Sequence, residues 1–123
     1  MERKEKGATG ELIALIHLRR IGYELLYKNI RFGRVEVDLI MLDKDSVVFV
    51  EVKARKCNSF GLPREAVDLK KQKRLVRAAL SYMQKLGSEV NIRFDVVEVD
   101  LNIGAVNHII NAFTADSMLI TKV

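Results

Sequence analysis

Val35-Glu36-Val37-Asp38-Leu39-Ile40-Met41-Leu42 is followed, after a short polar stretch, by Val47-Val48-Phe49-Val50-Glu51-Val52-Lys53. Both runs are rich in β-branched and aliphatic residues, which favours β-strands. The polar stretch Asp43-Lys44-Asp45-Ser46 has the composition of a tight turn, so the two runs predict an antiparallel hairpin. Strict alternation in the first run places alternate residues on opposite faces: Val35, Val37, Leu39 and Met41 on one, and Glu36, Asp38, Ile40 and Leu42 on the other.

The length of the turn sets the register of this hairpin. A two-residue turn at Lys44-Asp45 predicts four opposed pairs: Leu42 with Val47, Ile40 with Phe49, Asp38 with Glu51, and Glu36 with Lys53. Directly opposed side chains point to the same face, with Cβ atoms about 5 Å apart. The open end of the hairpin is therefore predicted to gather three carboxylates and one ammonium group.

Carboxylates at this spacing repel one another, and a half-buried position increases the cost. A divalent cation removes the conflict, because Mg²⁺ binds one or two carboxylates and keeps water or phosphate oxygens as its other ligands. We expect Asp38 and Glu51 to hold the metal, with the backbone carbonyl of Val52 as a further ligand. Lys53 is placed to contact a phosphate or to orient an attacking water, as metal-assisted phosphodiester hydrolysis requires.

Two simpler interpretations remain open. Glu36 and Lys53 can form a cross-strand salt bridge while Asp38 and Glu51 face solvent. Glu11 interrupts an apolar helical stripe, so it either supports the acidic cluster or is an acidic residue favoured by the N-terminal end of a helix.

The rest of the chain predicts an α/β domain that covers residues 1–123. A helix is expected over Glu5–Ile21 with Gly22 as its cap, and a strand over Tyr23–Arg31. A loop over Cys57–Pro63 then leads into a long helix from about Arg64 to Leu86. Val90–Leu101 predicts a fourth strand buried on both faces or bulged, and His108–Phe113 a short helix or an edge strand. The order is helix, three strands, helix, strand and a short final element, which indicates a mixed sheet flanked by helices.

The 123 residues carry 21 Lys and Arg against 16 Asp and Glu, a net charge of +5. Residues 53–77 hold nine basic and two acidic residues, so this segment carries 9 − 2 = +7 and the remainder 5 − 7 = −2. Such a concentration predicts either a solvated helix face or a surface that binds phosphates. The candidate nucleic-acid-binding residues are Arg55, Lys56, Lys70, Lys71, Gln72, Lys73, Arg74 and Arg77.

Several classes of protein and site are disfavoured. The longest apolar run, Leu12–Ile16, is far shorter than the roughly 18 residues of a membrane span. No signal-peptide core follows Met1, and a lone Cys57 can form neither an internal disulfide nor a cysteine-based zinc site, so a reducing cytoplasm is expected. His17 and His108 lack partners at metal-ligand spacing and are expected to serve packing.

The chain resembles one known family over nearly its whole length. Asp38 followed by Glu51-Val52-Lys53, with the helical Glu11 before them, is similar to the PD-(D/E)xK nuclease superfamily. The closer resemblance is to the YraN-like family of bacterial endonuclease-like proteins, on the segments Gly7-Ala-Thr-Gly10-Glu11, Asn29-Ile-Arg31, Lys71-Gln72, Arg93-Phe94-Asp95-Val96-Val97 and His108-Ile-Ile-Asn-Ala112-Phe113. Val35 departs from the family pattern, which usually has glycine there, and stiffens the start of the strand.

The resemblance implies a restriction-endonuclease-like fold related to archaeal Holliday-junction resolvases. It implies a site built on Asp38, Glu51 and Lys53 that uses Mg²⁺ or Mn²⁺, with Glu11 and Glu36 supporting metal binding. The expected activity is endonucleolytic cleavage of DNA, with branched DNA as a candidate substrate and a homodimer as a candidate assembly. The alternative is a nucleic-acid-binding module that keeps the fold without catalysis.

Overall fold

The computed structural model describes residues 3–56, 68–88 and 90–114. Within them the chain forms α1 (Arg3–Arg20), β1 (Glu24–Phe32), β2 (Val35–Asp43), β3 (Ser46–Arg55), α3 (Leu69–Leu86), β4 (Asn91–Asp100) and β5 (Val106–Phe113). The predicted order of elements is confirmed, and the element near the C-terminal end is a strand. The loop predicted over Cys57–Pro63 lies outside the described residues.

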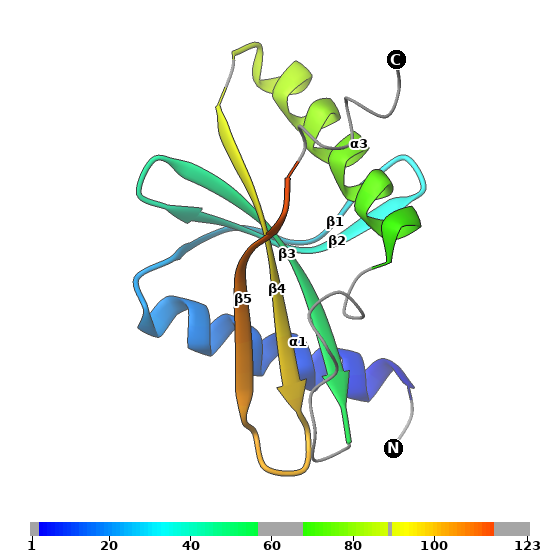
Figure 1. Cartoon of the computed structure of the whole chain (residues 1–123), viewed down its shortest axis with the longest axis vertical. Helices are drawn as coiled ribbons and strands as arrows, with labels where there is room; N and C mark the ends of the chain where they lie inside the picture. Colours follow the sequence, from blue (N-terminus) through cyan, green and yellow to red (C-terminus); the bar gives the residue numbers. More distant parts are fainter. Residues whose placement is uncertain (1–2, 57–67, 89, 115–123) are drawn as a thin grey trace.

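The five strands form one mixed sheet in the order β1-β2-β3-β4-β5. Strands β3 and β4 are parallel, and the other three neighbouring pairs are antiparallel. Parallel neighbours need a crossover connection, and α3 lies in the chain between these two strands. Figure 1 shows α1 crossing the sheet near one end and α3 lying along its other face. The predicted α/β class with a mixed, helix-flanked sheet is confirmed.

The two helices cover opposite faces of the sheet, and neighbouring residues of β3 point alternately toward one helix and the other. Val48 and Val50 pack with the α1 residues Ala14, Leu15 and Leu18. Phe49, between them in the chain, packs instead with α3, through Leu75, Val76, Ala78, Ala79 and Tyr82. Both clusters are apolar, so β3 is buried on its two faces, as expected for a central strand.

Helix α1 lies very close to the C-terminal end of β3. A Cβ atom built on Gly10 would lie 2.4 Å from the Cβ of Ala54, a distance that side chains do not tolerate. The absence of a side chain at Gly10 and the small one at Ala54 therefore allow this approach. The contact places the next residue, Glu11, beside the end of the hairpin that carries the acidic residues.

Helix α3 begins later than the sequence predicts. Asp68 has an extended backbone (φ −74°, ψ 168°), and its Oδ1 accepts a hydrogen bond of 2.8 Å from the N–H of Lys71. Asp68 is therefore the N-cap, and the prediction of one continuous helix from about Arg64 is wrong, because the carboxylate caps a helix that starts at Leu69. Residues 64–67 lie outside the described part of the chain. The predicted end before Gly87 is confirmed, since Gly87 has φ 72° and donates to Met83 O.

None of the helices in the described part of the chain is long and apolar enough to cross a membrane.

Candidate functional site

The β2–β3 hairpin has the predicted register at its turn but not at its open end. Ile40 pairs with Phe49 and Leu42 with Val47, as expected. The ladder stops at Leu39 and Val50, so the predicted pairs Asp38–Glu51 and Glu36–Lys53 do not form. Instead, Oδ2 of Asp38 accepts a hydrogen bond of 2.8 Å from the backbone N–H of Val52. A carboxylate thus takes the place of a strand partner where β2 and β3 separate.

The strict alternation predicted for β2 is wrong at Asp38. Val37 packs in the cluster on the α3 side together with Ile40, whereas Leu39 packs on the α1 side. Strand β1 departs from an extended backbone at the same level: Asn29, between the pairs of Ile30 with Val37 and Lys28 with Leu39, has φ 51°. The change of face releases Asp38 from the regular pleat and lets it reach the backbone of β3.

Asp38 and Glu51 form an electrostatically unfavourable pair of acids. Glu51 is buried, and this burial together with the charge of Asp38 raises the pKa of Glu51 to about 7. Burial also raises the pKa of Asp38, although the Val52 N–H and the charge of Lys71 act in the opposite direction. Oε2 of Glu51 is buried and accepts no hydrogen bond. Both acids are therefore in positions that a cation would stabilise.

Two lysines supply part of the positive charge that these acids need. Nζ of Lys71, in the first turn of α3, lies 3.7 Å from Oε2 of Glu51. At this distance the two groups form an ion pair but not a hydrogen bond. Lys53, half-buried on β3, also opposes the rise in the pKa of Asp38 and of Glu51. The site thus combines two acids and two lysines. The sequence predicted Lys71 only as a DNA contact, and the structure places it beside Glu51 as well.

The other two predicted acids differ from each other. Glu11 is half-buried on α1, and its pKa is raised first by burial and then by the charge of Asp38, while a hydrogen bond with Asn29 opposes both. Glu11 therefore belongs to the same electrostatic cluster. Glu36 is exposed and lies 3.3 Å from Arg31 of β1. The salt bridge of Glu36 with Lys53 that the sequence left open is not formed, because β2 pairs with β1 at this level and not with β3.

The residues fit a metal site with two protein carboxylates better than a site with three or more. In the described ranges, no group of three or more His, Cys, Asp and Glu side chains could hold a metal ion. The four predicted acidic ligands, Asp38, Glu51, Glu11 and Glu36, therefore do not form one such group; the backbone carbonyl of Val52 stays a prediction. Two carboxylates are nevertheless enough for Mg²⁺ or Mn²⁺ with water and phosphate as further ligands, and the buried oxygen of Glu51 that accepts no hydrogen bond suits such an ion.

The exposed face of α3 carries most of the predicted phosphate-binding residues. Its opposite face is buried against the sheet. Of the predicted residues on this helix, Lys70, Lys73, Arg74 and Arg77 are exposed, whereas Gln72 is half-buried. Arg55 ends β3 and Lys56 follows it, exposed. These two lie on the strand of Glu51 and Lys53, so the basic residues begin next to the acids.

A second polar cluster, centred on Asp95 of β4, was not identified from the sequence. The buried Asp95 carboxylate accepts hydrogen bonds from Arg93 Nε (2.9 Å), Tyr23 Oη (3.2 Å) and the Asn111 N–H (3.0 Å), and lies 2.8 Å from His108 Nε2. Burial alone would raise the pKa of Asp95, but the bonds from His108 and Arg93 lower it to about 2. The cluster is well satisfied and ties β4 to β5 and Tyr23. The spacing Arg93-Phe94-Asp95, with both polar residues on one strand face, was the available signal.

Glu98 of β4 is another buried acid that sequence reasoning missed. It is 1% exposed, and its Oε1 accepts a hydrogen bond of 2.8 Å from Asn107 Nδ2 while Oε2 has no partner. Glu98 lies beside Lys53 in the parallel register, which places both side chains on one face of the sheet. Its carboxyl group therefore shares a sheet face with the lysine of the candidate site.

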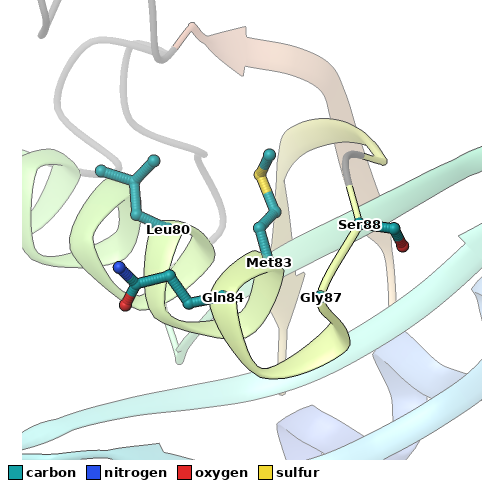
Figure 2. Close-up of a pocket in the computed structure, with 5 residues that line it drawn as sticks. All are labelled: Leu80, Met83, Gln84, Gly87 and Ser88. Atoms are coloured by element: carbon teal, nitrogen blue, oxygen red, sulfur yellow. The ribbon is translucent and has the colours of Figure 1, made fainter.

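A cavity at the opposite end of α3 has no comparable chemistry. Its volume is about 450 Å³, and its walls are Leu80, Met83, Gln84, Gly87 and Ser88, drawn in Figure 2. None of these side chains titrates near neutral pH. Met83 is also roughly 18 Å along the helix from Lys71, at 1.5 Å per residue. The candidate site is therefore the cluster at the open end of the hairpin.

Comparison with known proteins establishes the family. Residues 10–99 match the model of the uncharacterised protein family UPF0102. A UPF0102 protein of Caldanaerobacter subterraneus subsp. tengcongensis is 44% identical over 92% of this chain and 98% of its own length. A UPF0102 protein of Clostridioides difficile is 43% identical over 92% of this chain and 100% of its own length. The chain therefore belongs to UPF0102, and the resemblance to the YraN-like family is confirmed.

Among solved structures, the chain is similar to a repair endonuclease from Pyrococcus abyssi. The TM-score is 0.49 and the sequence identity 21%, over 99% of this chain. The chain spans 44% of that structure.

Proposed function

We propose that this UPF0102 protein is an endonuclease that uses Mg²⁺ or Mn²⁺ to hydrolyse phosphodiester bonds in DNA, with branched DNA among its substrates. The observation that carries the proposal is the pair of acids at the open end of the hairpin. Burial raises the pKa of both acids, the charge of Asp38 raises that of Glu51 further, and an oxygen of Glu51 is buried without a hydrogen bond. A divalent cation held by the two carboxylates would satisfy both acids and would supply a Lewis acid for a DNA phosphate.

Each residue has a definite role in this proposal. Asp38 and Glu51 bind the metal, which when present supplies Lewis-acid activation of the phosphate and of a water molecule. The Val52 N–H holds the Asp38 carboxylate in place. Lys53, on the same strand face as Glu51, orients the water or stabilises charge on the phosphate. Glu11 supports metal binding through its electrostatic interaction with Asp38. Glu36, which pairs with Arg31, supports it from the exposed edge of the site.

The basic face of α3 binds the DNA backbone. Lysine and arginine contacts to phosphates position a duplex without reading its sequence. Because the first turn of α3 lies beside Glu51, a backbone held along this helix passes the acidic pair. This arrangement favours recognition of DNA by shape and charge, which suits branched substrates.

Cleavage assays with Mn²⁺ on linear and branched DNA test the site directly. We expect Asp38→Ala and Lys53→Ala each to lower the cleavage rate on the order of 100-fold or more. Asp45→Ala is the matched control, because Asp45 is an exposed carboxylate in the turn at the other end of the same hairpin. Full activity of either site variant would remove that residue from the mechanism.

A non-catalytic nucleic-acid-binding module is the second candidate. It is favoured by the ion pair between Lys71 and Glu51, which gives the buried acid a cation without a metal. Calorimetric titration of Mn²⁺ into wild-type protein and Glu51→Gln separates the two functions. Binding that Glu51→Gln weakens supports the nuclease, whereas no binding by wild type at millimolar Mn²⁺ supports the module.

A further inference from the structure

Lys71 differs from the other basic residues of α3. Its side chain is 31% exposed and its ammonium faces Glu51, whereas Lys70, Lys73, Arg74 and Arg77 are exposed. The Asp68 carboxylate holds the backbone N–H of Lys71 at the N-terminus of the helix. Lys71 is therefore anchored at its backbone, and only the long side chain is free to change partners.

The ion pair with Glu51 is loose. Nζ of Lys71 lies 3.7 Å from Oε2, and the same oxygen accepts no hydrogen bond although the Glu51 side chain is only 9% exposed. A metal ion would lie about 2.0–2.1 Å from a carboxylate oxygen. The ammonium and a metal ion cannot both be closest to Oε2, so they compete for it.

We propose that Lys71 is the internal counter-ion of the acidic pair: it withdraws from Glu51 when the metal binds and then contacts a backbone phosphate of the DNA. This inference rests on the proposed metal-dependent function and adds a link between its two ligands. Without DNA, the metal must displace the ammonium. With DNA, a phosphate offers the ammonium a new partner.

The consequence is positive coupling between metal and DNA. If DNA increases the affinity for the metal by some factor, the metal must increase the affinity for DNA by the same factor. Lys71 carries this coupling because its single charge serves either Glu51 or the phosphate. A neutral side chain of similar length at this position should separate the two binding events.

Calorimetric titration of Mn²⁺ in the absence of DNA provides the first test. We expect Lys71→Met to bind Mn²⁺ about fivefold more tightly than wild type, at the lower end of usual coupling factors. Lys70→Met is the matched control, since it removes the same charge from an exposed neighbour on the same helix, and should bind like wild type. With a phosphorothioate duplex present, the Mn²⁺ affinity of wild type should rise and that of Lys71→Met should change less.

A lysine-acylation experiment on the wild-type protein tests the withdrawal without any substitution. Mass spectrometry should show faster acylation of Lys71 when Mn²⁺ is added, and unchanged acylation of Lys70. Equal or weaker Mn²⁺ binding by folded Lys71→Met, or unchanged acylation of Lys71 at saturating Mn²⁺, would overturn the inference while leaving the nuclease proposal intact. If wild type binds no Mn²⁺ at all, the proposed function itself fails.

Discussion

At the level of single residues, Glu51 and Asp38 are two partly or fully buried acids whose ionisation is unfavourable. Burial and the neighbouring carboxylate raise the pKa of Glu51 from its ordinary 4.5 to about 7, so near neutral pH the folded protein holds a proton that the unfolded chain has lost. A group whose pKa is raised on folding stabilises the fold below its unfolded pKa and loses that contribution as the pH rises through the folded value.

The metal-free protein should therefore become less stable as the pH rises from about 4.5 to 7. Since each pKa unit corresponds to about 1.36 kcal/mol, Glu51 accounts for at most about 3 kcal/mol of this loss. Urea denaturation at a series of pH values in the presence of a chelator measures it. Glu51→Gln should flatten the profile over this window, and Glu24→Gln, at an exposed acid, should leave it unchanged. A Glu51→Gln profile as steep as that of wild type would contradict the assignment.

The sequence predicted part of this residue-level arrangement. Asp38 and Glu51 could be placed together because a short turn determines which residues of a hairpin are neighbours. The position of Lys71 beside Glu51 could not, because it depends on how α3 lies on the sheet. The Asp95 cluster was missed for the same reason, since its members come from three places in the chain, Tyr23, β4 and β5, that only the assembled fold brings together.

At the level of elements, the contact of α1 with β3 positions Glu11. It depends on Gly10, whose Cα faces Ala54 so closely that an added Cβ would lie 2.4 Å from the Ala54 side chain. Gly7, one turn earlier in the same helix, has nothing within 4 Å of an added Cβ. The two glycines therefore allow a controlled comparison: both lie in α1, but only Gly10 is packed against another element.

Gly10→Ala should destabilise the protein by about 1–3 kcal/mol, because the overpacking outweighs the gain in helix propensity. Gly7→Ala should stabilise it by up to about 1 kcal/mol, because only the propensity changes. Thermal or urea unfolding of the two variants measures the difference. If both variants were stabilised alike, α1 would not lie against β3 as closely as the structure has it.

The elements themselves were largely predictable, and the exceptions are local. The turn composition gave the hairpin register near Lys44 and Asp45 correctly, because a two-residue turn leaves few alternatives. The change of face at Asp38 was not predictable, since every residue of β2 is consistent with strict alternation. The start of α3 was misplaced because Asp68 reads equally well as a helical residue or as a cap until its backbone conformation is known.

At the level of the whole molecule, opposite charges are divided between neighbouring surfaces. Asp38 and Glu51 lie at the end of the hairpin, and most of the exposed cations of the basic segment that the structure describes lie along α3. This part of the charged segment therefore corresponds to one surface of the fold. Exposed cations that bind phosphates release counterions, which makes the affinity for DNA depend on salt.

DNA binding should weaken steeply with salt, with a slope of log K against log [salt] of about −0.9 for each phosphate contacted on a duplex. The double variant Arg74→Gln/Arg77→Gln should reduce the magnitude of this slope by about 1 to 2. Arg19→Gln/Arg20→Gln removes the same charge from exposed positions at the end of α1 and should leave it unchanged. Fluorescence anisotropy over a range of salt concentrations measures both slopes, and equal losses in the two variants would exclude α3 as the contact surface.

The local origin of the acidic pair also bears on the order of folding. Asp38 and Glu51 belong to one hairpin with a two-residue turn, and such hairpins form within about 1–10 μs. The parallel pairing of β3 with β4 joins residues 98 − 53 = 45 positions apart and must close a far longer loop. We therefore expect the two acids to come together while the chain is still open and water can solvate them. We expect their burial, and the docking of α3 that brings Lys71 to Glu51, to follow in the later, slower steps.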